Sequence, residues 1–479
     1  MTPSSPLDLD RETMRQLGHR VADLVAEHLS SLREQPVQQF LPRPDARALI
    51  AGPPPRQGQP FEDIVTFLRE RVFPYHAREP HPRFLGYVPG SPTFPAIAGD
   101  WIATGFNFFA GVWSVAAGPN ELELTVLEWF REWLGMPEAS GGLLTSGGSG
   151  ATLTAVVAAR HAALGDRADG LPRLTAYCSD QAHSAVVRGA WIAGITREHV
   201  RSIPTDDQYR MRMDALAEAI AADRARGLQP FLVVGSAGTT STGAVDPMHA
   251  LAELAAREQM WFHVDAAYGG FAALTDRGRG LLDGVGRADS IALDPHKWLF
   301  VPFECGCVLV RDPRALTAAF RIMPEYLSDV QARDQDVNFA DRGEQLTRYA
   351  RALKVWVMVQ YFGLDAIREA IAHGMALAQL AESLVADAPE LEVITPAQLG
   401  IVCFRVHPRG LDDEAALNAL NERVNASVNA TGRVLISSTR LRGTFALRIC
   451  ALSFRTTADD IRSVIALVRE TARGLGATG

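Results

Sequence analysis

Three features of the sequence predict an α/β protein whose centre is a mostly parallel sheet. Between residues 143 and 310, short apolar runs alternate with segments of helical periodicity, as in parallel strands covered by helices on both faces. Hydrophobic residues make up 47% of the chain, charged residues 21%, and there are 40 glycines, which is typical of a folded, enzyme-like protein. At 479 residues the chain exceeds a usual single domain, so we expect several lobes around a large core.

Charge and composition exclude several classes of partner. The formal net charge of −8 argues against nucleic acid or an anionic membrane as the main partner. The first residues form no basic and apolar signal segment, and no window approaches about 18 uncharged apolar residues, so we expect a cytoplasmic protein outside the membrane. The cysteines lack metal-ligand spacing, so we expect no metal site and reduced core thiols at Cys178, Cys305, Cys307, Cys403 and Cys450.

Residues 1–90 are predicted to form a helical arm. Apolar residues at helical spacing predict an amphipathic helix over 10–32, and a second helix is expected over 61–72. The Pro-rich connector between them, residues 35–60, is predicted to contain neither regular helix nor inner strand. Two helices joined in this way cannot bury a core of their own, so we expect the arm to pack on another element, such as a second subunit.

Residues 91–362 are predicted to form the large lobe. Aromatic residues among glycines and prolines at 81–90 and 105–113 suggest loops that line a pocket or an interface, with ordinary core as the alternative. Strands are expected at 174–178, 231–234, 261–264, 290–293 and 307–310. Helices are expected at 95–104, 121–134, 152–163, 184–193, 213–224 and 247–258.

The last part of the chain is predicted to form a separate, small α+β lobe, residues 363–479. The segment 321–345 before it is long, polar and poorly periodic, which suggests a mobile lid or a disordered surface loop. An apolar helix over 347–362 then leads into the small lobe. Within that lobe, strands are expected at 401–406 and 445–450 and helices at 414–428 and 458–475.

Polar residues follow four of the predicted strands directly. In open parallel sheets, ligands bind beyond the carboxyl ends of the strands, so the loops that begin there should converge on one site. These loops cover residues 180–183, 236–241, 265–268 and 294–297.

Lys297 is the leading candidate for chemistry because lysine is rare in this chain. Lys297 and Lys354 are the only lysines among 47 basic residues. Arginine cannot lose its proton or form an imine, whereas a lysine in a partly apolar pocket can attack a carbonyl. The sequence therefore favours a Schiff-base lysine, with a lysine kept by chance or for a salt bridge as the alternative.

A glycine-rich stretch at 144–154 directly precedes a predicted helix. Glycines such as Gly148 let backbone N–H groups approach an anion, and Ser149 can cap the helix or donate to a phosphate. Neither the P-loop signature nor the dinucleotide fingerprint is present. An amine, a phosphate cradle and the strand-end acid Asp265 are together what pyridoxal phosphate requires, since that acid would keep the pyridine nitrogen protonated. The alternative role for Asp265 is a helix or turn cap.

Four motifs together resemble the group II pyridoxal-phosphate-dependent amino acid decarboxylases, which include the aromatic-L-amino-acid, histidine and glutamate decarboxylases. They are Lys297 within Asp-Pro-His-Lys-Trp, Asp265 within His-Val-Asp-Ala-Ala-Tyr, His183 within His-Ser-Ala-Val, and the Gly148-Ser149 turn. The resemblance runs from about residue 13 to 471 and is closest to aromatic-L-amino-acid decarboxylase. It implies a fold-type I enzyme, an obligate homodimer with a swapped N-terminal arm, a large cofactor domain and a small C-terminal domain.

The resemblance also implies roles for individual residues. Lys297 would bind the cofactor covalently, Asp265 would pair with its ring nitrogen, and Tyr326 in the expected lid would protonate the substrate carbon. His183 and Ala267 would cover the two ring faces. The other implied cofactor contacts are Gly148, Ser149, Thr240, Asp294 and His296. Aromatic-L-amino-acid decarboxylases usually carry Asn at the position of Asp294, and a carboxylate there would repel the phosphate unless another group intervenes.

The expected substrate is an L-amino acid, with an aromatic side chain preferred. The residues that match substrate-pocket or interface regions of the aromatic enzymes are Tyr87, Val88, Pro89, Phe109, Trp113 and Thr347. At the position of Thr347, plant members of the family that this chain resembles carry Gly or Ser, and the resemblance thus implies a preference for phenylalanine, tyrosine or dopa over tryptophan. Oxidative decarboxylation to an aldehyde, a non-aromatic substrate, an aminotransferase or desulfurase, and a silent binding protein remain as alternatives. Arg448 could meet a carboxylate or pair structurally.

Overall fold

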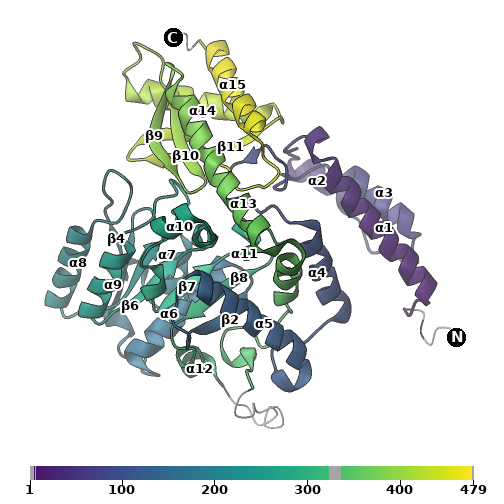
Figure 1. Ribbon diagram of the computed structural model, residues 1–479. Coiled ribbons are helices and arrows are strands. Elements are labelled where there is room, and N and C mark those ends of the chain that lie inside the picture. Colours follow the sequence, from purple (N-terminus) through teal and green to yellow (C-terminus); the bar gives the residue numbers. More distant parts are fainter. Residues whose placement is uncertain (1–4, 6, 323–335, 477–479) are drawn as a thin grey trace.

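The computed structural model describes residue 5, residues 7–322 and residues 336–476 (Figure 1). Its larger sheet has seven strands in the order β2-β8-β7-β6-β5-β3-β4. The pairs β3·β4, β3·β5, β5·β6 and β6·β7 are parallel, whereas β8 runs antiparallel to both β7 and β2. The strands are β2 (Gly141–Thr145), β3 (Leu174–Ser179), β4 (Val200–Ile203), β5 (Gln229–Ser236), β6 (Trp261–Asp265), β7 (Ser290–Leu293) and β8 (Gly306–Val310). The predicted α/β class and mostly parallel sheet are confirmed.

Two strands of this sheet were not predicted from the sequence, and both lie at its edges. The expected strands correspond to β3, β5, β6, β7 and β8, whereas β2 and β4 were not expected. β2 begins with two glycines, and the residues of β4 alternate little in polarity and are only partly buried. β4 thus carries a weak apolar pattern, whereas β2 is mostly buried but has only Leu143 and Leu144 as apolar side chains after its glycines.

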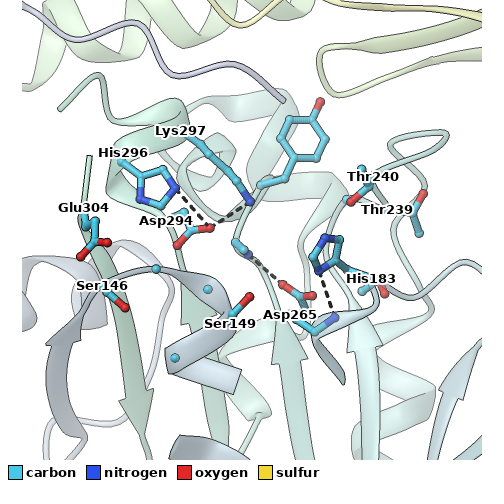
Figure 2. Close-up of a pocket in the computed structure, with 18 residues that line it drawn as sticks. Ser146, Ser149, His183, Thr239, Thr240, Asp265, Asp294, His296, Lys297 and Glu304 are labelled. Carbon is cyan, nitrogen blue, oxygen red and sulfur yellow. Dashed lines mark hydrogen bonds and ion pairs between the residues drawn. The ribbon is translucent and has the colours of Figure 1, made fainter. Parts of the chain in front are cut away.

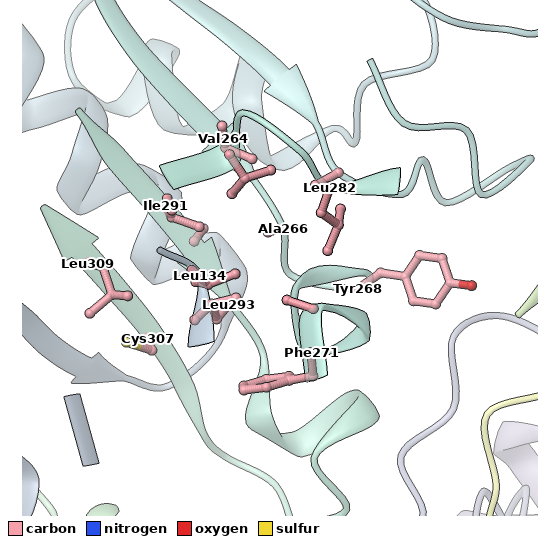
Figure 3. Close-up of a cluster of buried hydrophobic side chains, with 14 of the residues drawn as sticks. Leu134, Val264, Ala266, Tyr268, Phe271, Leu282, Ile291, Leu293, Cys307 and Leu309 are labelled. Atoms are coloured by element: carbon pink, nitrogen blue, oxygen red, sulfur yellow. The ribbon is translucent and has the colours of Figure 1, made fainter. Parts of the chain in front are cut away.

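Helices cover both faces of the sheet and close its core. The covering helices include α5 (Trp113–Trp133), α6 (Gly148–Leu164), α7 (Ala185–Ile192), α8 (Met213–Ala225), α9 (Met248–Arg257), α10 (Asp276–Leu281) and α12 (Arg314–Phe320). On the inner strands, Val264, Ile291 and Leu309 are fully buried, and Figure 3 shows them near Leu134 and Phe271. Burying each such side chain contributes about 1.5–3 kcal/mol, so these strands form the rigid frame of the molecule.

The smaller sheet has five strands in the order β1-β11-β12-β10-β9. It is antiparallel except for the β1·β11 pair. Its elements are β1 (Phe84–Leu85), β9 (Leu391–Gln398), β10 (Ile401–Val406), β11 (Leu435–Leu441), β12 (Thr444–Cys450), α14 (Glu414–Ala430) and α15 (Ala458–Gly474). The expected strands and helices of this region are present, but β1, β9 and β11 were missed because β9 and β11 are partly exposed and β1 is very short.

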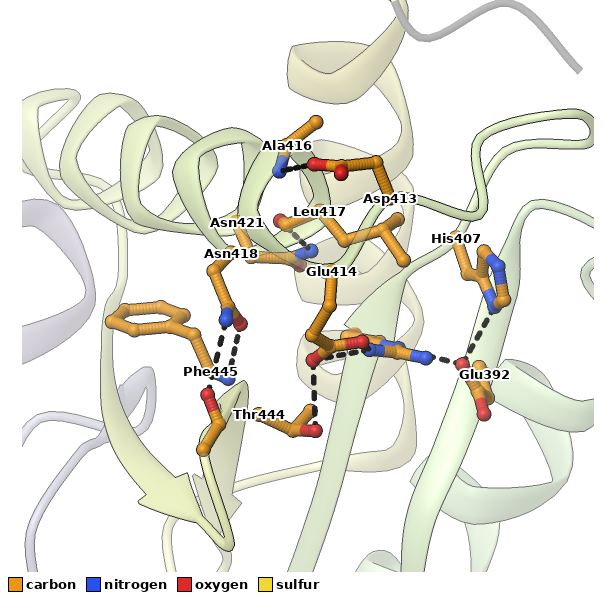
Figure 4. Close-up of polar contacts among 12 residues, drawn as sticks. Glu392, His407, Asp413, Glu414, Ala416, Leu417, Asn418, Asn421, Thr444 and Phe445 are labelled. Atoms are coloured by element: carbon orange, nitrogen blue, oxygen red, sulfur yellow. Dashed lines mark hydrogen bonds and ion pairs between the residues drawn. The ribbon is translucent and has the colours of Figure 1, made fainter.

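A polar network holds α14 on the smaller sheet (Figure 4). Arg405 on β10 lies between Glu392, at 2.6 Å, and Glu414, at 2.8 Å. The buried Asn421 side chain donates to the Val406 carbonyl and accepts from the Val406 amide, so a helix side chain completes the hydrogen bonds of a strand. Every polar group in this contact therefore has a partner, as burial requires.

Helix α13 (Ala352–Ala386) joins the two sheets (Figure 1). The expectation of a helix over 347–362 was wrong at its start, because Thr347 lies in a bend and the helix begins at Ala352. The backbone leaves helical geometry at Gly363, whose φ of 74° favours glycine, and helix resumes after it. No helix among the residues described here is long and apolar enough to cross a membrane.

The N-terminal arm lies at the side of both sheets (Figure 1). Its helices are α1 (Arg11–Ser30), α2 (Arg43–Ile50) and α3 (Phe61–Arg71). α1 and α3 were expected, but α2 lies inside the Pro-rich connector, where helix had been excluded. Pro44 falls in its first turn, where the missing N–H is not needed by the helix. None of the α1 side chains is fully buried in this chain: α1 pairs with α3 through Arg20 and Glu62, and its apolar positions are only partly covered by the described residues.

A fully buried ion pair ties β2 to the rest of the large lobe. Arg348 and Glu123 are 2.7 Å apart with side-chain exposures of 0% and 1%. Arg348 also donates to the carbonyls of Ala110 and Leu144, and Glu123 accepts the Leu144 amide. The pair thus fixes the strand that leads into the glycine-rich turn.

We expect the substitution Glu123→Gln to lower the free energy of unfolding by about 3–5 kcal/mol, because it leaves the Arg348 charge buried and uncompensated. Chemical denaturation followed by tryptophan fluorescence measures the change. The matched control is Asp312→Asn, which removes the exposed pair with Arg314 and should cost less than about 1 kcal/mol. Equal losses in the two variants would contradict the importance of the buried pair.

Candidate active site

A cavity of about 240 Å³ lies at the carboxyl ends of the parallel strands (Figure 2). All nine residues expected to contact a cofactor line it: Gly148, Ser149, His183, Thr240, Asp265, Ala267, Asp294, His296 and Lys297. The four strand-end loops and the glycine-rich turn thus converge. Nine further lining residues were not singled out individually. Ala185 and Glu304 lie outside the segments expected at the site, whereas the others lie within them: Ser146, Gly147, Gly150, Ser236, Gly238, Thr239 and Tyr268.

Lys297 reaches the cavity from the short helix α11 (Pro295–Trp298), directly after β7. Its Nζ atom lies 2.9 Å from Asp294 Oδ2 (Figure 2). The next residue, Trp298, is fully buried and stacks on Tyr268 with ring centroids 5.3 Å apart. This anchor fixes the direction in which the lysine projects.

Asp265 ends β6 beside the strand that precedes Lys297. Its Oδ1 atom accepts the Ala267 amide at 3.2 Å, which holds the carboxylate at the cavity wall. His183 lies in the loop after β3, and its Nδ1 accepts the Ala185 amide at 3.2 Å. With Nδ1 accepting, a neutral His183 carries its proton on Nε2.

The glycine-rich turn brings backbone close to the other walls of the cavity. A Cβ atom on Gly148 would lie 2.9 Å from Asp294 Oδ2 and 3.0 Å from Ala267 Cβ. A Cβ on Gly306 would lie 2.4 Å from Gly147 Cα. Glycine therefore permits the start of α6, with its unpaired N–H groups, to form one end of the cavity, where an anion is stabilised.

His296 supports the lysine loop without carrying a charge of its own. Its Nδ1 accepts the Cys305 amide at 3.3 Å, and its ring packs edge-on against Phe303. Burial lowers the pKa of His296, although the nearby Asp294 carboxylate opposes that shift. The imidazole is therefore neutral near pH 7.

Lys354, the second lysine, is structural. Its Nζ atom lies 2.7 Å from Asp100 Oδ1 and donates to the backbone carbonyls of Pro302, Phe303 and Glu304 at 3.3–3.4 Å. These carbonyls belong to the loop that carries Glu304 to the cavity. The salt-bridge alternative raised for a lysine thus holds for Lys354.

The six expected substrate residues do not line this cavity. Tyr87 and Phe109 are 66% and 37% exposed, and Thr347 is exposed in a bend. Val88 and Pro89 follow Tyr87 after β1, and Trp113 begins α5, where its amide donates to Asn338. Tyr326 lies outside the described residues.

Arg448 bridges three segments near the cavity. It is 3% exposed and donates to the Ser241 carbonyl, to Ser437 Oγ and to the Tyr87 carbonyl. Of the two roles left open for Arg448, these contacts are those of a structural pairing between the two sheets and the end of the arm.

The donors of this cavity suit pyridoxal phosphate. Lys297 offers an amine for its aldehyde, Asp265 a carboxylate for its ring nitrogen, and the start of α6 a cradle for its phosphate. The fold and the site together define an enzyme that uses this cofactor.

Comparisons with known proteins identify the family. Residues 45–407 match the pyridoxal-dependent decarboxylase conserved domain. The chain is 38% identical over 470 residues to an aromatic-L-amino-acid decarboxylase of Bacillus atrophaeus, which covers 98% of this chain and 97% of that protein. It is 31% identical to phenylacetaldehyde synthase of Arabidopsis thaliana, over 97% of this chain and 96% of that protein.

Solved structures agree with the sequence comparison. The structure of Oryza sativa TDC with PLP and tryptamine superposes with a TM-score of 0.94 at 32% identity, covering 99% of this chain and 100% of that one. The chain therefore belongs to the pyridoxal-dependent decarboxylase family, as the motifs indicated. It is a carboxy-lyase whose cofactor is pyridoxal phosphate.

The buried His263 lies on β6, the strand that ends in Asp265, and makes the stability of the folded protein depend on pH. Burial lowers the pKa of His263 to about 4, opposed by Asp265 and by the bond with Ser290 Oγ. The folded state thus holds a neutral imidazole, whereas the unfolded chain binds a proton below about pH 6.5. Stability is therefore lost as the pH falls from about 6.5 toward 4.

We expect acidification from pH 7 to pH 5 to lower the free energy of unfolding of the wild type by about 2 kcal/mol more than that of the variant His263→Gln, which lacks the titrating imidazole. Denaturation midpoints at the two pH values provide the measurement, with the exposed His249→Gln as the matched control. The same pH dependence in wild type and His263→Gln would show that another group is responsible.

Proposed function

We propose that this enzyme decarboxylates an aromatic L-amino acid to the corresponding amine and CO₂. The observation that carries the proposal is the convergence of Lys297, Asp265 and the start of α6 in one cavity. Similarity to an aromatic-L-amino-acid decarboxylase and to tyrosine and tryptophan decarboxylases supports the aromatic substrate.

The cofactor supplies an electron sink for the electrons released when the Cα–carboxylate bond breaks. Asp265 keeps a proton on the ring nitrogen, which maintains that sink. Lys297 would hold the cofactor through its amine. His183 and Ala267, which both line the cavity, would hold the cofactor ring, and Tyr326 would donate a proton to the substrate Cα.

Gly148, Ser149 and Thr240 would hold the phosphate. Gly148 and Ser149 lie in the first turn of α6, where N–H groups point at the cavity. His296 positions the lysine loop through its bond from the Cys305 amide.

The substrate pocket would be completed by a second copy of the chain. The proposed pocket residues Tyr87, Val88, Pro89, Phe109, Trp113 and Thr347 do not line the cavity of one chain. α1 buries no side chain, and the helix α4 (Phe94–Phe106) exposes Trp101, Ile102 and Phe106. Such apolar surface is typical of an interface, so we infer an obligate homodimer with an exchanged N-terminal arm.

The same proposal divides the chain into an arm (1–90), a cofactor domain (91–362) and a small domain (363–479). The two sheets, joined by α13, support the second boundary. The five cysteines are all free and buried, which supports the proposed cytoplasmic location.

Aldehyde formation is the second candidate function, favoured by the similarity to phenylacetaldehyde synthase. Such a reaction consumes O₂, whereas simple decarboxylation does not. The presence of both His183 and Tyr326 in the sequence favours the amine as product.

We expect CO₂ and amine to form in equal amounts from phenylalanine, tyrosine or dopa, at a higher kcat/KM than from tryptophan, without O₂ uptake. A panel of the twenty amino acids and dopa, with CO₂, amine and O₂ measured together, tests this. Lys297→Met is the inactive control. O₂ consumption in step with CO₂ would instead establish the aldehyde-forming reaction, and preference for an acidic substrate would refute the aromatic assignment.

We expect Tyr326→Phe to raise the aldehyde fraction of the product at least several-fold, because the hydroxyl that protonates Cα is lost. Chromatography of amine and aldehyde gives the ratio. Tyr361→Phe, which removes a hydroxyl from an exposed tyrosine on α13, is the matched control. An unchanged ratio in Tyr326→Phe would remove the role assigned to that residue.

A further inference from the structure

Asp294 places a carboxylate at the end of the cavity where a phosphate binds. Its side chain is 4% exposed, and its Oδ2 atom lies 2.9 Å from the position of a Cβ on Gly148, the first residue of α6. The corresponding position on Gly147 lies 3.9 Å from Oδ1. The carboxylate thus lies beside the first turn of α6, whose N–H groups would hold the anion (Figure 2).

The cation paired with Asp294 is Lys297, the same residue that would bind the cofactor. Lys297 Nζ lies 2.9 Å from Oδ2, but this nitrogen becomes bonded to the cofactor carbon. His296 Nε2 is 3.7 Å away, too far for a hydrogen bond, and its ring is neutral. Among the described residues, Asp294 Oδ1 has no hydrogen-bond partner.

The surrounding elements add negative rather than positive charge. Asp265 and Glu304 also line the cavity, from β6 and from the loop after α11. Glu344 lies beside the first turn of α6, where its Oε1 atom is 3.7 Å from the position of a Cβ on Gly150. Apart from the histidines His183 and His296, Lys297 is the only basic side chain among the described residues that line the cavity.

The other ionisable groups nearby do not change this balance. Lys354 is engaged by Asp100 and by three carbonyls. Burial raises the pKa of Cys305 to about 12, so this thiol is neutral. A phosphate dianion would therefore meet the Asp294 carboxyl group with no other cationic side chain between them.

We propose that Asp294 and the cofactor phosphate share one proton, which is taken up from solvent when the cofactor binds. The shared proton converts a repulsive contact into a short O–H···O hydrogen bond and gives the free Oδ1 a partner. Asp294 is then a positioning residue that couples cofactor retention to pH. This inference rests on pyridoxal phosphate binding at Lys297, as in the proposed function.

The expected pH dependence follows from the phosphate, whose second ionisation has an ordinary pKa of about 6. Free pyridoxal phosphate is therefore mostly without that proton between pH 7 and 9. Binding that takes up one proton then weakens by about tenfold for each pH unit. Loss of Asp294 removes this dependence.

The test is calorimetry of pyridoxal phosphate binding to the cofactor-free full-length protein at pH 8, in two buffers of different ionisation enthalpy. The wild type should take up about one proton more than Asp294→Asn, and the Kd ratio of wild type to variant should rise about tenfold per pH unit. Asp289→Asn, directly before β7 and outside the cavity, should behave as wild type.

Pyridoxal, which lacks the phosphate, provides a comparison that needs no variant. The wild type should bind it with about one proton less than it takes up with pyridoxal phosphate. Equal proton uptake for the two ligands, or for wild type and Asp294→Asn, would overturn the shared proton. Loss of the uptake in His296→Gln would place the proton on the imidazole and overturn the assignment to Asp294.

These outcomes separate the inference from the proposed function. If the wild type binds pyridoxal phosphate without extra proton uptake, the shared proton is refuted but the proposed function stands. A wild type that does not bind pyridoxal phosphate at all overturns the proposed function itself.

Discussion

The parallel pairing of β6 with β7 is the constraint on which the site depends. Asp265 lies opposite Ala292 in this register, and the Ala266 amide donates to the Ala292 carbonyl at 2.9 Å. The chain beyond Ala292 therefore delivers Asp294 and Lys297 to the edge at which Asp265 ends. Because the side-chain period of a strand is two, a shift of one residue would turn Asp265 away from the cavity. The buried side chains of these strands make such a shift costly.

Sequence reasoning located the core of the site because each element there carries a local signal. Strand ends such as Asp265 and Lys297 follow apolar runs, and Ser149 lies in a recognisable glycine-rich turn. Ser146 belongs to the same Thr-Ser-Gly-Gly-Ser-Gly stretch and could have been included on that ground. Glu304 had no such signal, because its place depends on a loop held by the distant Lys354.

The errors of sequence reasoning arose where long-range contacts or weak patterns decide the structure. The helix α2 formed in a Pro-rich connector because its proline occupies the tolerated first turn. The helix expected from Thr347 starts later, because the adjacent Arg348 extends into the core to meet Glu123. Neither contact is visible in the periodicity. Likewise, Tyr87 and Phe109 belong to surfaces that one chain leaves exposed, so no local pattern could decide what they contact.

The two lysines of this chain show why arginine could replace lysine everywhere else. Lys297 needs an amine for reactivity, since a guanidinium forms no imine. Lys354 needs one for shape, because its nitrogen is surrounded by Asp100 Oδ1 and three consecutive backbone carbonyls, all within 3.4 Å. An ammonium directs three hydrogens to such a cluster around one point, whereas a planar guanidinium directs five outward in a fork. The carbonyls that Lys354 binds lie in the loop directly after α11, the helix that carries Lys297. Lys354 therefore supports the position of Lys297.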